Sequence, residues 1–147
     1  MGNKRINIIK LEKHRILSDT EFEVQFRLCR IDPSLFTHEA HLRLAWIHIN
    51  NYGVTTAKKN IEHQIKKFVK HVGAEDKYHQ TITIASIEAV YHFMKRSAAK
   101  DFETFIEQNS KLKTDFKNLI SSHYSQNIFN SQKARIEYVE PDIQPFI

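Results

Sequence analysis

Cysteine and the turn-forming residues glycine and proline are scarce in this sequence. Its 147 residues include three glycines, three prolines and a single cysteine, Cys29. So few turn residues argue against a many-stranded β fold, which needs frequent tight turns. One cysteine excludes an intrachain disulfide, and we expect Cys29 to be a small buried side chain in a reducing cytoplasm. No cysteine pair is present to bind a structural zinc ion.

Long apolar runs and recognisable nucleic-acid motifs are also missing. No stretch approaches the roughly 20 apolar residues that span a bilayer, and the N-terminus lacks the pattern of a cleavable secretory signal, so no membrane partner is expected. The net charge is +5, but the lysines are scattered and form no basic and aromatic stacking surface. Since zinc-finger and helix-turn-helix signatures are absent too, nucleic acid is not an expected partner. Glycine-rich phosphate loops, dinucleotide fingerprints and nucleophile elbows are not found.

The sequence is rich in apolar residues at helical spacing. Hydrophobic residues make up 41% of the chain and include ten phenylalanines, enough for one core. They recur three and four positions apart, which is typical of amphipathic helices. We therefore predict an all-α fold, a single domain over residues 1–147 that forms an irregular bundle of about five to seven helices. Residues 1–16 are expected to be a loosely held arm, and residues 125–147 to form short helices and an extended tail.

Capping residues and stop signals place the expected helices along the chain. Ser18 and Glu21 have the spacing of a capping box, and Thr37 and Ser131 are expected N-caps. The fourth helix is predicted to be the longest, and its wide apolar surface indicates a central position. The approximate helix bounds are 18–30, 38–52, 55–72, 75–96, 101–106 and 110–120, with short turns after 125 and 131.

Histidines at helix starts are the most informative polar feature. His38 and His41 lie one turn apart on one helix, His79 begins another, and His123 lies near the C-terminus. The positive end of a helix dipole favours neutral imidazole, the form that binds metals or acts as a general base. Helical bundles often build metal sites from facing helices. We therefore predict that these four histidines bind a divalent transition metal such as zinc, iron, manganese or nickel.

Polar neighbours of these histidines complete a candidate pocket. Tyr78, Tyr124 and Thr83 would supply hydrogen bonds, while Arg43 and Lys77 would hold an anionic group. No catalytic residue is assigned, because the H-x-x-H spacing is not the H-E-x-x-H motif of zinc proteases. The alternative for each histidine is structural, capping backbone groups or bonding a buried tyrosine or aspartate. The pocket comprises His38, His41, Arg43, Lys77, Tyr78, His79, Thr83, His123 and Tyr124.

Four segments are similar to motifs of a protein family. They are His38 with His41-Leu42-Arg43-Leu44-Ala45-Trp46, Lys77-Tyr78-His79 with Thr81-Ile82-Thr83, His123-Tyr124-Ser125 and Glu140-Pro141-Asp142. They resemble the H-x-x-H-L-R-L-A-W, K-Y-H-E-T-I-T, H-Y-S and E-P-D-L motifs of a family of small uncharacterised bacterial helical proteins. The resemblance covers about residues 20–145, with Gln80 in place of the family's glutamate. It implies that the motif histidines share one site, and it implies no activity.

Two functions from different classes fit these features. The first is a small cytoplasmic enzyme, metal-dependent or with a metal-free polar pocket, that acts on a small molecule. The second is a non-catalytic interaction or regulatory module whose histidines are structural. In that case the aromatic-rich tail, with Phe129, Tyr138 and Phe146, would suit a homo-oligomer. Convergence of the imidazole nitrogens would favour the metal enzyme over the module.

Overall fold

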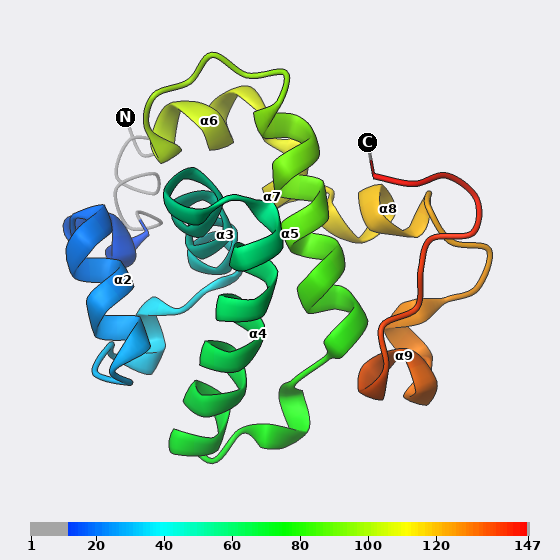
Figure 1. Cartoon of the computed structure of the whole chain (residues 1–147), viewed down its shortest axis with the longest axis horizontal. Helices are drawn as coiled ribbons and strands as arrows, with labels where there is room; N and C mark the ends of the chain where they lie inside the picture. Colours follow the sequence, from blue (N-terminus) through cyan, green and yellow to red (C-terminus); the bar gives the residue numbers. More distant parts are fainter. Residues whose placement is uncertain (1–11, 147) are drawn as a thin grey trace, which may run out of the picture.

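The all-α architecture is confirmed by the computed structural model, which describes residues 12–146 (Figure 1). This part of the chain contains eight α-helices and four short 3-10 turns, and no strand. The helices are α2 (Asp19–Arg27), α3 (His38–Tyr52), α4 (Val54–His71), α5 (Gln80–Met94), α6 (Phe102–Gln108), α7 (Lys111–Thr114), α8 (Phe116–Ser121) and α9 (Gln132–Ile136). The 3-10 turns are η1 (Lys13–Ile16), η2 (Pro33–Leu35), η3 (Glu75–Lys77) and η4 (Ile128–Asn130). Within the described range no helix combines the length and apolar character needed to cross a bilayer.

Local capping signals set several of the helix starts. The Ser18 side chain accepts a hydrogen bond from the Glu21 amide, and the Glu21 carboxylate accepts one from the Ser18 amide, which completes the predicted capping box. Thr37 caps α3 by accepting from the Ala40 amide. Ser131 caps α9 in the same way. These three starts are confirmed as predicted.

Helices α3, α4 and α5 form the centre of the molecule. In α3 every residue from Leu42 to Ile49 is buried, so this helix is enclosed on all sides. Helices α4 and α5 lie side by side in Figure 1, and η3 joins their lower ends. The turn from α3 to α4 uses Gly53 at a φ of +82°, a left-handed conformation that glycine adopts without strain.

Two predicted helices are interrupted in the structure. The range 75–96 divides into η3 and α5, because His79 has extended backbone and its side chain caps α5. The range 110–120 divides into α7 and α8 at Asp115, where φ is −138°. As a result α4, with 18 residues, is longer than α5, with 15, and the prediction that the fourth helix is the longest was wrong.

The two ends of the described chain are held by specific contacts. Most of the predicted loose arm, residues 1–11, lies outside the described residues. Residues 12–16, in contrast, are fixed on α3, and His14 is fully buried. The extended segment after α9 packs back on the bundle, where Thr81 Oγ1 donates to the Glu137 carbonyl oxygen and the Ile143 amide donates to the His123 carbonyl oxygen. The loose-arm prediction was therefore wrong for residues 12–16.

Candidate functional site

Three of the four predicted metal ligands form hydrogen bonds to backbone carbonyl oxygens. His38 Nε2 lies 3.0 Å from the Leu112 oxygen. His79 Nε2 lies 2.9 Å from the Ile128 oxygen, and His123 Nδ1 lies 2.8 Å from the Gln144 oxygen. Each imidazole therefore joins its own segment to a different distant part of the chain. These contacts fit the alternative to metal binding, in which the histidines satisfy backbone groups.

The structure does not bring these four histidines into one site. Among residues 12–146, the group of at least three possible ligands whose atoms lie within 4.8 Å of one another consists of Glu12, His14 and Glu39. None of these three belongs to the predicted set. The physical reason is that an imidazole near a helix start can satisfy a carbonyl oxygen from another segment, and buried carbonyl groups require such partners.

Arg43 and Tyr124 also form contacts with the backbone of other segments. Arg43 donates to the backbone oxygens of His14, at 2.7 Å, and Leu17, at 2.8 Å. It also pairs with Asp19 at 2.8 Å. Tyr124 donates from its hydroxyl to the Val139 oxygen, and burial is the main cause that raises its pKa. Both side chains hold segments together instead of facing a shared pocket.

Five predicted pocket residues do line one cavity, of about 360 Å³, between α3, α4 and the start of α5. We call it the His41 cavity. The predicted residues in its wall are His41, Lys77, Tyr78, His79 and Thr83. The rest of the wall is apolar and consists of Pro33, Phe36, Ile65, Phe68, Val69, Val72, Ala74 and Ile82.

One ring nitrogen of His41, in this mostly apolar wall, has no hydrogen-bond partner among the described residues. This atom, Nε2, is buried. Burial, together with the nearby His38, lowers the pKa of His41 to about 4. The imidazole is therefore neutral at physiological pH, with one nitrogen able to donate and the other able to accept. Since a buried polar atom without a partner is costly, Nε2 marks a position where an external group would be stabilised.

Apart from Lys77, the other polar side chains of the cavity already have partners. His79 uses both nitrogens, because Nδ1 accepts from the Ile82 amide at 3.1 Å while Nε2 meets the Ile128 oxygen. The Tyr78 hydroxyl donates to Gln80, and burial raises the pKa of Tyr78 to about 12. Thr83 donates to the His79 oxygen at 2.7 Å. His41 is thus the side chain in this wall that combines a buried nitrogen with unused hydrogen-bonding capacity.

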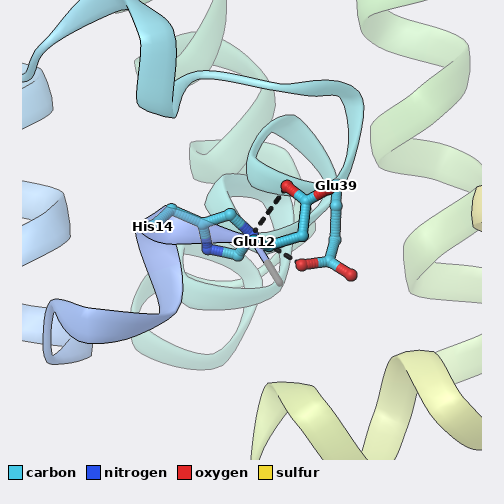
Figure 2. Close-up of side chains that lie close together, drawn as sticks. All are labelled: Glu12, His14 and Glu39. Carbon is cyan, nitrogen blue, oxygen red and sulfur yellow. Dashed lines mark hydrogen bonds and ion pairs between the residues drawn. The ribbon is translucent and has the colours of Figure 1, made fainter. Parts of the chain in front are cut away.

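A second polar cluster joins residues 12–15 to α3 and α7. We call Glu12, His14, Arg15, Glu39 and Lys113 the Glu39 network. His14 and Glu39 are fully enclosed, with Nε2 2.6 Å from Oε2, and Glu12 lies 3.6 Å from the same nitrogen (Figure 2). Sequence pattern carries no signal for this pairing, since an acidic residue in a first helical turn is usually explained by the helix dipole.

Cations already surround the carboxylate of Glu39. Arg15 lies 2.7 Å from Glu39, and Lys113 lies 3.0 Å from it and 3.6 Å from Glu12. Burial alone would raise the pKa of Glu39, but hydrogen bonds from His14, Arg15 and Lys113 outweigh it and hold the pKa well below its usual range. The arrangement therefore acts as an ion-pair tether, and a metal ion would have to compete with both cations.

Comparisons with known proteins add no relative to this picture. No family model matches the chain, and neither a curated protein nor a solved structure matches it.

Proposed function

We propose that the protein binds a small, largely apolar molecule in the His41 cavity, with Nε2 of His41 as its buried polar contact. The single observation that carries this proposal is an unpartnered imidazole nitrogen beside a cavity of about 360 Å³. Sites for small molecules are typically concave, mostly apolar and equipped with a few placed polar groups. The His41 cavity has each of these properties.

The walls of the cavity suit an aromatic or aliphatic body. Phe36 and Phe68 lie edge to face with ring centroids 5.5 Å apart, and both line the cavity. Ile65, Val69 and Val72 extend the apolar surface along α4. A ring or alkyl chain placed there would bury apolar area, which favours binding by roughly 25 cal/mol for each Å² removed from water.

The two functions predicted from the sequence receive unequal support. A metal-dependent enzyme receives less, because three of its four expected ligands bind backbone oxygens. A binding protein with structural histidines accounts for those contacts and leaves His41 for a ligand. The proposal therefore keeps the small-molecule partner of the first function and the structural histidines of the second.

An NMR titration with phenylacetamide tests the proposal. This probe has an aromatic body and an uncharged amide that can meet Nε2 as donor or acceptor. We expect saturable shifts confined to backbone amides around the cavity. Val69→Trp fills the cavity and should abolish them. His63→Trp, at an exposed position of the same helix, is the matched control and should leave them unchanged.

Two results would contradict the proposal. One is a wild-type spectrum that does not respond to the probe at any soluble concentration. The other is a response that Val69→Trp and His63→Trp both retain, since binding would then lie elsewhere. Circular dichroism of the two variants shows whether either substitution has changed the helical fold.

A further inference from the structure

We infer that the ligand of the His41 cavity is an amphipathic carboxylate, with its apolar body between α3, α4 and α5 and its anionic group at Lys77 and His41. This inference rests on the proposed function and names the chemical class of the ligand. It is carried by the distribution of charge around the cavity.

The wall of the cavity carries positive charge and no carboxylate. Lys77 is the one permanently charged residue among the wall residues, and it forms no ion pair with any residue between 12 and 146. Its acidic neighbours Glu75 and Asp76 line a separate hollow with Tyr78 between the two spaces. An anionic ligand would therefore meet an unpaired ammonium group, whereas a cationic ligand would meet only repulsion.

One acidic group beside Tyr78, that of Glu62, is already engaged. Glu62, whose charge contributes to the raised pKa of Tyr78, accepts a hydrogen bond from Gln80 and pairs with Lys66 at 3.8 Å. The ammonium group of Lys66 also lies 5.4 Å from the centre of the Tyr78 ring. The charge of Glu62 is thus balanced locally, and Lys77 remains the one permanent charge in the cavity wall itself.

Two long helices begin close to the cavity wall. His41 is the fourth residue of α3, and His79 and Ile82 lie at the start of α5. The partial positive charge of a helix N-terminus favours a nearby anion. Helix α4 ends at the same cavity, and its opposite partial charge faces Lys70 and His71 in its own last turn.

A carboxylate can interact with both available polar groups of the site, Nε2 of His41 and the ammonium group of Lys77. A neutral imidazole can place its proton on Nε2, and His41 can then donate to a carboxylate oxygen. Lys77 is exposed, and its flexible four-carbon side chain lets the ammonium group approach the same carboxylate from the solvent side of the cavity. A hydrogen bond to a charged acceptor is stronger than one between neutral groups, which adds to the preference for the anion.

Three ligands with one aromatic ring and different charges test the inference. They are phenylacetate, phenylacetamide and phenethylamine, titrated into the wild-type protein at low salt. We expect phenylacetate to bind roughly two- to fivefold more tightly than the amide, the range of a partly exposed ion pair. The amine should bind more weakly than the amide. High salt should remove most of the difference, because exposed charges are screened.

A charge-neutralising variant locates the preference. Lys77→Gln should remove the difference in affinity between phenylacetate and the amide. Lys111→Gln, an exposed position on α7 that does not line the cavity, removes the same net charge and should keep the preference.

The outcomes separate the two claims. Equal binding of acid and amide in the wild type overturns the carboxylate inference while the proposed function stands. Loss of the preference in both lysine variants also overturns it, because net charge would then be the cause. Failure of all three probes to bind contradicts the proposed function itself.

Discussion

His79 joins the start of α5 to the carbonyl oxygen of Ile128, 49 residues later in the chain. Its Nδ1 accepts the Ile82 amide proton, so Nε2 carries the proton that is donated across the 2.9 Å contact. One imidazole thus caps a helix and fixes the η4 turn on it. Both nitrogens are used, which leaves His79 no lone pair for a metal ion.

His79→Ala should lower the free energy of unfolding by about 2 kcal/mol, because it removes an N-cap and a long-range hydrogen bond that contribute about 1 kcal/mol each. His79→Asn should recover about half, since asparagine is a good N-cap but is too short to reach Ile128. Urea unfolding of the three proteins measures both changes. Equal losses in the two variants would show that the cap contributes nothing.

Glu39→Gln should destabilise the protein by about 3 kcal/mol at neutral pH, since it removes one partner of a buried charge cluster. The folded pKa of Glu39 is held low mainly by His14, Arg15 and Lys113 against the effect of burial. The stability that its charge contributes is therefore present above the ordinary pKa of 4.5 and is lost as pH falls below it.

Urea unfolding between neutral and acid pH measures this contribution. The variant should lose less stability than the wild type over the acid range. Glu107→Gln, at an exposed position of α6, serves as the control and should change stability by less than about 0.5 kcal/mol. A wild type and a Glu39→Gln variant with parallel pH profiles would contradict the assigned role.

The sequence predicts well those features of the fold that depend on interactions between residues a few positions apart. Helix α3 begins and ends where Thr37 and Gly53 indicate, because a cap and a glycine act on their own turn. The break at His79 is different. It depends on an imidazole that caps α5 while bonding the distant Ile128, and helical periodicity continues across it without any sign of interruption.

In the candidate site, too, features set by neighbouring residues are predictable from the sequence, whereas contacts between distant segments are not. The helix-entry positions of His41 and His79 and the apolar stripe of α4 indicate the two sides of the cavity from local pattern alone. Which histidine stays unpartnered depends on which carbonyl oxygens lie opposite, and periodicity says nothing about that. The pairing of His14 with Glu39, 25 residues apart, is hidden for the same reason.

Trp46→Ala should cost about 3–5 kcal/mol of unfolding free energy, as expected for removing a large buried aromatic side chain. The indole is 5% exposed and packs on Phe105 with ring centroids 4.8 Å apart. Denaturant unfolding followed by circular dichroism measures the loss, and Trp46→Phe should retain part of the stability. A loss below about 1 kcal/mol for the alanine variant would contradict this burial.

Zinc should bind the Glu39 network only after its cations are removed. In the wild type, Arg15 and Lys113 neutralise the carboxylates of Glu12 and Glu39. We expect zinc to leave the wild-type melting temperature unchanged and to raise that of the Arg15→Gln/Lys113→Gln variant, because ligands that bind the folded state stabilise it.

The matched control for this experiment is Lys59→Gln/Lys111→Gln, which removes the same net charge from exposed positions. It should not respond to zinc. Tight zinc binding by the wild type, lost in His14→Gln, would show instead that the cluster is a metal site. Scanning calorimetry with and without zinc distinguishes these results.

His41→Leu should flatten the pH dependence of stability between about pH 6.5 and 4 and should not destabilise the protein at neutral pH. Burial and His38 lower the pKa of His41 from 6.5 to about 4 in the folded protein. Over this window the unfolded chain binds a proton that the folded protein does not, so stability falls as pH falls. The full effect is at most roughly 3 kcal/mol.

Leucine at position 41 removes both the titration and the unpartnered Nε2. His63→Leu, at an exposed position of α4, is the control and should keep the wild-type slope. Urea unfolding at neutral pH and near pH 5 measures the difference, and an unchanged slope in His41→Leu would mean that other buried groups control the acid sensitivity.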